Sequence, residues 1–124
     1  MIRNNPMKKM EVIVATEKVD IVYRALKRYG IDNVFIVNGY GRGLFQNIVL
    51  TGARGTGSYR PELIQASKIE LIVSDREVED VLNIITKNAG IGINEGIVGR
   101  AMIIPIEQIR KLEKVISKQQ SEDE

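Results

Sequence analysis

The sequence contains two near-copies of one motif, KMEVIV at residues 9–14 and KIELIV at residues 68–73. Charged and apolar residues alternate at the start of each copy, which is the period of a β-strand with one buried face. Both copies are followed at the same offset by two valines, Val19 and Val22 in the first half and Val78 and Val81 in the second. The repeat therefore predicts two units of the same construction, each made of a strand, a helix and a second strand.

A helix is expected after each repeated strand. Thr16 can cap the first helix, which we expect to run to residue 29 and to end at Gly30. Asp75 can cap the second helix, which we expect to run to about Asn88. The apolar residues of the first helix share one side, which is predicted to lie on the sheet: Val19, Val22, Tyr23, Leu26 and Tyr29.

The remaining strands are expected at residues 33–37 and 101–105, where apolar residues gather. Two strand–helix–strand units in succession give the ferredoxin-like βαββαβ arrangement. This is an α+β fold with a four-stranded antiparallel sheet and two helices on one face. A long insertion follows the second strand, and the apolar spacing of residues 106–116 predicts a short C-terminal helix.

The sheet face away from the helices is predicted to carry Ile13, Ile36 and Ile72. Because an apolar sheet face is unfavourable in water, we expect a partner subunit to cover it. The lysines and glutamates of the repeated motif are expected to form paired surface charges.

The composition is that of an ordinary globular protein. Its 124 residues are 44% hydrophobic and 27% charged, which suits one domain with its own core. We expect a disordered lead-in at residues 1–7, a single domain at 8–116 and a charged tail at 117–124. A net charge of +2 gives no electrostatic reason to expect binding to nucleic acid. No apolar run reaches the roughly 20 residues of a membrane span, so we expect no membrane insertion and a cytoplasmic location.

Histidine and cysteine are absent from the sequence. A zinc or copper site would therefore need unusual ligands, and no metal is expected. Cys–His and Ser–His catalysis are excluded for the same reason. No pair of carboxylates stands out as catalytic, so we expect no catalytic residues and no enzymatic activity.

Two glycine-rich segments could bind an anion. The first is GYGRG at residues 39–43, and the second is residues 90–100, which end in Arg100. Peptide N–H groups beside a guanidinium, such as that of Arg42, form a suitable site for a phosphate. The alternative for each segment is a plain hairpin or loop with one solvated arginine.

The chain resembles the PII superfamily of trimeric signalling proteins over roughly residues 8–111. The motifs that carry the resemblance are KKMEVIV at 8–14, GYGR at 39–42, KIELIV at 68–73, GIVGR at 96–100 and IEQIRK at 106–111. The resemblance implies a homotrimer that binds an adenine nucleotide (ATP, ADP or AMP) in clefts between subunits. It also implies a regulatory role.

The resemblance implies nucleotide contacts from three places in the chain. The residues are Gly39, Gly41 and Arg42 at the base of the long loop, Gly96, Gly99 and Arg100 before the last strand, and Arg110 and Lys111 from the next subunit. Residues 44–64 correspond to the T-loop, through which we expect the protein to regulate a membrane transporter or a metabolic enzyme.

Three positions depart from the usual pattern of the family. Gly43 and Ala66 stand where typical members have a glutamine and a lysine that serve 2-oxoglutarate sensing, so sensing of that ligand is not implied. Tyr59 lies in the long loop but in the context GSYRP, which does not match the modified tyrosine of typical members. We therefore interpret the chain as a divergent PII-like protein.

Two other functions are open at this point. A trimeric metal-tolerance or metal-binding protein of the CutA kind has the same fold, but it predicts a short ordered hairpin and metal-liganding side chains. A small enzyme on a ferredoxin-like frame would require a catalytic base.

Overall fold

The structure of the chain is a computed structural model, which describes residues 6–43, 50–51, 58–59, 63–91 and 99–114. Its main sheet has four antiparallel strands in the order β2-β5-β1-β6. These strands are β1 (Met7–Ala15), β2 (Val34–Gly41), β5 (Ile64–Ser74) and β6 (Arg100–Ile106). Two short strands, β3 (Leu50–Thr51) and β4 (Ser58–Tyr59), pair with each other outside the main sheet.

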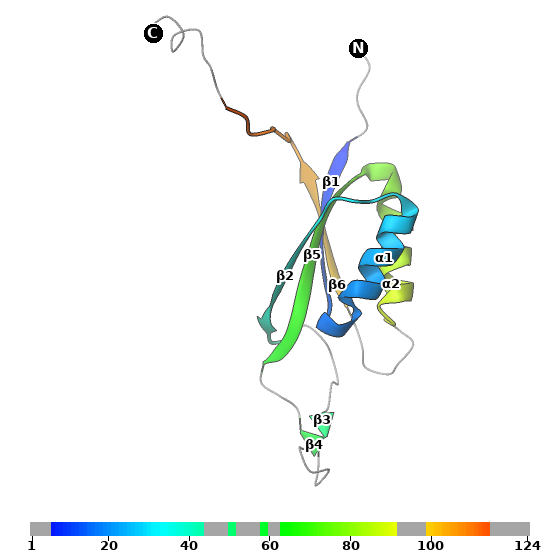
Figure 1. Cartoon of the computed structure of the whole chain (residues 1–124), viewed down its shortest axis with the longest axis vertical. Coiled ribbons are helices and arrows are strands. Elements are labelled where there is room, and N and C mark those ends of the chain that lie inside the picture. Colours follow the sequence, from blue (N-terminus) through cyan, green and yellow to red (C-terminus); the bar gives the residue numbers. More distant parts are fainter. Residues whose placement is uncertain (1–5, 44–49, 52–57, 60–62, 92–98, 115–124) are drawn as a thin grey trace, which may run out of the picture.

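Both helices lie against one face of the main sheet (Figure 1). The helices α1 (Val19–Tyr29) and α2 (Val78–Asn88) each follow one 3₁₀ turn, Thr16–Lys18 and Asp75–Glu77. The predicted α+β fold with its βαββαβ order is confirmed. Strand β1 begins at Met7, inside the segment expected as a lead-in.

The two copies of the repeated motif pair with each other in the middle of the sheet. Glu11 of β1 lies directly opposite Glu70 of β5, and Lys9 and Lys68 each lie opposite an isoleucine of the other copy. Exchanging the two copies reproduces the same pairing, so the motifs are related by an approximate two-fold axis. Because side chains alternate between the faces of a strand, this register turns the same face of both strands toward the helices.

The end of α1 follows the prediction, but its start does not. Gly30 has φ 116°, and its N–H donates to the carbonyl oxygens of Leu26 and Lys27 at 3.1 and 3.0 Å. Thr16 does not cap the helix, because its hydroxyl lies 2.9 Å from Ser67 Oγ on β5.

The turn before α2 is closed by Ser74 rather than by the predicted cap, Asp75. The backbone N–H and the hydroxyl of Ser74 both donate to Glu77 Oε1, at 3.1 Å each. Asp75 Oδ1 instead lies 3.2 Å from Lys8 Nζ, where it forms an ion pair with β1. The prediction was therefore one residue away from the capping residue.

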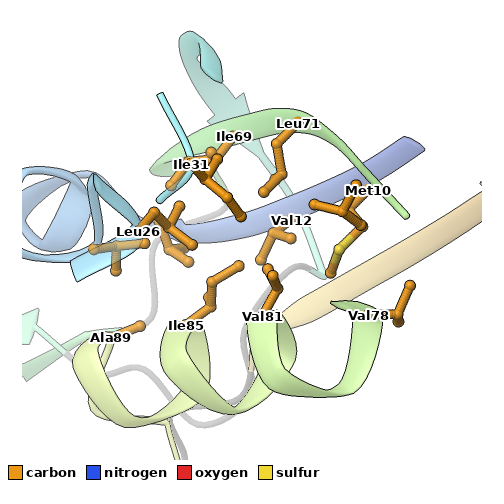
Figure 2. Packing of buried hydrophobic residues seen from close by; sticks show 13 residues of the cluster. Met10, Val12, Leu26, Ile31, Ile69, Leu71, Val78, Val81, Ile85 and Ala89 are labelled. Carbon is orange, nitrogen blue, oxygen red and sulfur yellow. The ribbon is translucent and has the colours of Figure 1, made fainter. Parts of the chain in front are cut away.

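The core fills the space between the sheet and the two helices (Figure 2). Alternate residues of β1 and β5 point into it from the sheet side, and the largest of them are Met10, Ile69 and Leu71. Tyr29, predicted to be buried, is exposed, because it lies at the last position of α1 and its hydroxyl donates to Asp80 Oδ2 at 3.2 Å. Desolvation and this hydrogen bond raise the pKa of the Tyr29 hydroxyl.

The other face of the sheet is covered by none of the described elements (Figure 1); we call it the open face. The isoleucines of the repeat lie there as predicted, and Ile72 is 44% exposed. Ile36 does not lie there, because it is opposite Ile69 and shares the helix-covered face. On β2 the open face instead carries Phe35, which is 64% exposed, and Val37.

The predicted C-terminal helix is absent from residues 107–114, the part of residues 106–116 that follows β6 and is described. An isolated amphipathic segment gains most of its helical stability from packing its apolar side. In this chain Ile109 is exposed and Leu112 is 94% exposed, so that packing is missing. The segment leads away from the sheet beyond the end of β6 (Figure 1).

Candidate functional site

The two glycine-rich segments meet at one end of the main sheet, which we call the loop end. Strand β2 ends there at Gly41, and β6 begins there at Arg100. The Arg100 guanidinium donates from Nη2 to the carbonyl oxygen of Gly43 at 3.1 Å. Gly43 has φ 75°, a conformation that glycine adopts without strain. A single chain therefore brings together segments that are 57 residues apart.

Gly39 and Gly41 belong to strand β2 rather than to a loop, and Arg42 follows them on the exposed surface. A β-carbon built on Gly39 would meet no atom within 4 Å. Gly39 also lacks the positive φ of Gly43. Neither packing nor backbone conformation therefore demands glycine at position 39, whereas a ligand that approaches the strand closely would demand it.

A hollow of about 140 Å³ lies beside Gly39 on the open face. Its lining residues are Ile13, Val37, Gly39, Tyr40, Ala66, Ser67 and Lys68. Gly39 and Ala66 lie directly opposite each other and leave room because both are small. One cation, Lys68, belongs to this lining. A second cation, Arg100, lies on the neighbouring strand β6, opposite Ile13. Apolar walls between cations suit a flat ligand that carries negative charge.

Four paired charges occupy the open face next to this hollow, and all come from the repeated motif. Lys9 Nζ lies 2.9 Å from Glu11 Oε2 and 3.5 Å from Glu70 Oε1, and Lys68 Nζ lies 2.9 Å from Glu70 Oε2. The hydrogen bond from Lys68 lowers the pKa of the Glu70 carboxyl. The hydrogen bonds to Glu11 and Glu70 raise the pKa of Lys9 and Lys68, respectively. The lysines thus offset the repulsion between two glutamates that face each other.

Gly99 has a packing role at the loop end. A β-carbon at this position would collide with the side chain of Ile91 and would come within 3.2 Å of the carbonyl oxygen of Ile13. A larger residue at position 99 would therefore require the end of the Ile91 side chain to move and the start of β6 to shift slightly away from β1. This requirement exists whether or not Gly99 also contacts a ligand.

Two of the other expected site residues are described, and neither is at the loop end. Arg110 and Lys111 follow the opposite end of β6, and the strand alone spans about 20 Å at the usual rise per residue. Both side chains are exposed. Gly96 and most of residues 44–64 lie outside the described residues. One chain therefore brings together Gly39, Gly41, Arg42, Gly99 and Arg100, and it leaves Arg110 and Lys111 apart from them.

A larger groove of about 580 Å³ lies on the open face toward the opposite end of the sheet. Phe35, Ile72 and Ile109 supply much of its apolar lining. Lys9 and Glu70, two of the four paired charges, also line it. The groove and the hollow therefore flank the same charge cluster.

Among the described residues, no group of three or more acidic side chains is placed to hold a metal ion. Neither of the two described α-helices has the length and apolar character needed to cross a membrane. Both statements concern only the part of the chain that the structure describes.

No sequence pattern indicated a role for Ser67. It has no exposed surface and is the only buried polar residue in the described ranges. Its Oγ lies 2.6 Å from Asn38 Oδ1 and 2.9 Å from Thr16 Oγ1, and these partners are 29 and 51 residues away in the chain. In contrast, the positions of Ile13 and Lys68 beside the hollow follow from the alternation of the repeated motif.

Comparison with known proteins gives a consistent result. A family model described as nitrogen regulatory protein P-II matches residues 7–115. The chain is 34% identical over 109 residues to the nitrogen regulatory protein P-II of Porphyra purpurea, which covers 86% of this chain and 91% of that protein. It is 31% identical over 86 residues to nitrogen regulatory protein P-II 2 of Methanothermobacter thermautotrophicus, with 69% of this chain and 73% of that protein covered.

A solved structure has a similar fold, the crystal structure of Arabidopsis thaliana PII bound to citrate. The match has a TM-score of 0.60 at 24% sequence identity. It covers 86% of this chain and 82% of the other.

Proposed function

Because the chain belongs to the nitrogen regulatory protein P-II family, we propose that it binds an adenine nucleotide at the loop end and relays this binding to a target protein. Membership of the family makes the chain a PII-like regulatory protein. The proposal adds ATP, ADP or AMP as the effector, a homotrimer as the assembly and residues 44–64 as the segment that contacts the target.

The observation that carries the nucleotide proposal is the hydrogen bond between Arg100 and Gly43 beside the hollow at Gly39. A guanidinium presents several N–H donors in a plane that matches the oxygens of a phosphate. A hollow of 140 Å³ exceeds the roughly 30 Å³ that one water molecule occupies, so it can admit part of a larger ligand. In the proposed site a purine base lies in the hollow and the phosphates lie toward Arg42 and Arg100.

The homotrimer proposal draws on the open face and on the place of Arg110 and Lys111. Those two cations lie beyond the opposite end of their own sheet, so a neighbouring copy would have to supply them to the loop end. An assembly of this kind would also cover Phe35 and Ile72. In an oligomer with closed symmetry every copy makes the same contacts. A trimer would have a mass of about 42 kDa, three times the 13.9 kDa of one chain.

The proposed target is a membrane transporter or a metabolic enzyme, and the protein is proposed to act in the cytoplasm without catalysing a reaction. A nucleotide at Arg42 and Arg100 would sit where the segment 44–64 leaves the sheet. A ligand changes the conformation of a loop only if it binds to one conformation of that loop more tightly than to another. The contact between Arg100 and Gly43 is a place where such a difference can arise.

Calorimetric titration of the purified protein tests the nucleotide proposal. The panel consists of ATP, ADP, AMP and cyclic di-AMP, with citrate added because the similar Arabidopsis structure holds it. We expect saturable heat with at least one of ATP, ADP and AMP, at one site per chain. A folded trimer that gives no heat with these three would contradict the proposal. Heat with citrate or cyclic di-AMP alone would support an anion-binding site but would contradict an adenine mononucleotide as the effector.

A further inference from the structure

One fully buried hydroxyl connects three segments near the loop end. Ser67 Oγ on β5 contacts Asn38 Oδ1 on β2 at 2.6 Å and Thr16 Oγ1, in the turn after β1, at 2.9 Å. A serine has one hydroxyl proton, so Ser67 donates to the Asn38 oxygen and accepts from the Thr16 hydroxyl. The result is a directed chain of hydrogen bonds from the turn before α1 to the edge of the sheet.

The position of this hydroxyl is unusual within its strand. The other buried residues on this face of β5 are apolar, namely Ile69, Leu71 and Val73, whereas Gln65 on the same face is exposed. A buried hydroxyl costs free energy unless it is hydrogen-bonded, and an apolar residue would avoid that cost. Ser67 is the buried member of this face nearest the loop end.

Strand β2 needs help to keep its register at this end. Among the described strands it is an edge strand with β5 as its only neighbour, and its last three residues include Gly39 and Gly41. Register is weakly specified where glycines replace side chains that would distinguish the two faces. A slip by one residue would turn Asn38 to the other face and separate it from Ser67. The hydrogen bond between them therefore opposes the slip.

We propose that Ser67 is a positioning residue, which through Asn38 holds residues 39–43 in the register that completes the loop end. Asn38 lies directly opposite Ser67, and the next pair, Gly39 and Ala66, lines the hollow. The same register carries Gly43 to Arg100. The effect on nucleotide binding rests on the proposed function, whereas the positioning itself is a property of the protein without ligand.

Amide hydrogen exchange of the ligand-free protein tests the positioning. Ser67→Ala should speed exchange roughly tenfold at those amides of residues 39–41 that bond to β5, because one hydrogen bond is lost there. Amides in the centre of β1 should change much less. Val73→Ala is the matched control, since it also truncates a buried residue of β5 but at the opposite end of the sheet. Its effect should not be concentrated at residues 39–41.

Substitutions at Asn38 separate the hydrogen bond from a general loss of packing. Asn38→Ala removes the acceptor and should reproduce the local effect of Ser67→Ala. Asn38→Asp keeps an oxygen acceptor and should stay close to the unsubstituted protein. The double variant of Ser67→Ala and Asn38→Ala should exchange no faster than either single variant, because both remove the same bond. Nucleotide Kd should rise roughly tenfold in both alanine variants and not in Val73→Ala.

Each result decides one part of the proposal. Even acceleration across the sheet in Ser67→Ala, or additive effects in the double variant, would overturn the positioning role. Local acceleration with unchanged nucleotide Kd would overturn the link between the register and the site. If the unsubstituted protein bound no nucleotide, the proposed function would fail, while the exchange data would still decide whether Ser67 fixes the register.

Discussion

The helix-covered face and the open face are formed by the same four strands, yet their side chains are satisfied in different ways. On the helix-covered face the apolar residues pack against α1 and α2 within one chain. On the open face the charges of the repeated motif are paired, but large apolar side chains such as Phe35 and Ile72 are left exposed. The comparison separates two roles: the covered face stabilises the fold of the single chain, and the open face is the one proposed to contact another subunit.

The sharpest test of this separation compares Leu71 and Ile72, which are adjacent in β5 but 2% and 44% exposed. Leu71→Ala should lower the free energy of unfolding by about 2–5 kcal/mol, because it leaves a cavity in the core. Ile72→Ala should cost less, because no packed core surrounds it in the single chain. Denaturant titration at low protein concentration measures both values. Equal losses would mean that the two faces contribute equally to folding.

A charge on the open face should prevent assembly. Phe35→Lys places an ammonium opposite Glu70, which the single chain tolerates, but burying it against another subunit is unfavourable. We expect the mass in light scattering to fall from about 42 kDa toward the 13.9 kDa of one chain. The control is Ile21→Lys on α1, where the isoleucine is 48% exposed on the other side of the molecule. Dissociation in both variants, or in neither, would contradict the assignment of the open face as the interface between subunits.

Loss of an arginine at the loop end should weaken nucleotide binding more than it affects folding. Arg42→Ala and Arg100→Ala should each cost roughly 1.5–3 kcal/mol, a ten- to hundredfold rise in Kd, because each removes charge-assisted hydrogen bonds to phosphate. Arg76→Ala is the control, since Arg76 is exposed at the opposite end of the sheet. Titration calorimetry gives the affinities and thermal unfolding gives the stabilities. Normal affinity in either loop-end variant would show that the arginine replaced in it does not bind the nucleotide.

The smallest expected effect comes from the paired charges. The Lys68 hydrogen bond lowers the pKa of folded Glu70 below its ordinary value of 4.5, so the ion pairs stabilise the fold above that pH. This contribution is lost as pH falls through the lowered pKa. Glu70→Gln removes it, so the stability difference between the two proteins should shrink as the pH falls through 4.5 and then through the lowered pKa. The difference should stay small throughout, because water and salt screen exposed pairs. A difference that does not vary with pH would contradict this origin.

The sequence predicted the fold well where its pattern was unambiguous. The alternation within the repeated motif identified the central strands, and the apolar spacing after each copy identified both helices. The pattern was insufficient in β2, because Val34 to Val37 are all apolar and alternation cannot assign their faces. Only the pairing with β5 shows that Phe35 and Val37, rather than Ile36, lie on the open face.

Two further differences concern contacts that local sequence does not encode. The spacing of Ile109 and Leu112 is compatible with a helix, but a helix also requires its apolar side to be packed, and both residues are exposed in the single chain. The two glycine-rich segments with Arg42 and Arg100 could be recognised from their residues, and the family resemblance added nucleotide binding, whereas the bond from Arg100 to Gly43 spans 57 residues and required the structure. The hydrogen bonds of Ser67 are equally remote in sequence.

The pairing between the two repeated strands also determines when the chain can fold during its synthesis. Partners in β1 and β5 are between 51 and 67 residues apart, from Ala15 with Ala66 to Met7 with Ser74. Strand β2 is made earlier but pairs only with β5 in the main sheet, so it too must wait. The entropy of closing such long loops is lost before their contacts form, which slows folding. The N-terminal half therefore contains none of the strand pairings of the main sheet, and a nascent chain stopped before the second motif should not fold stably.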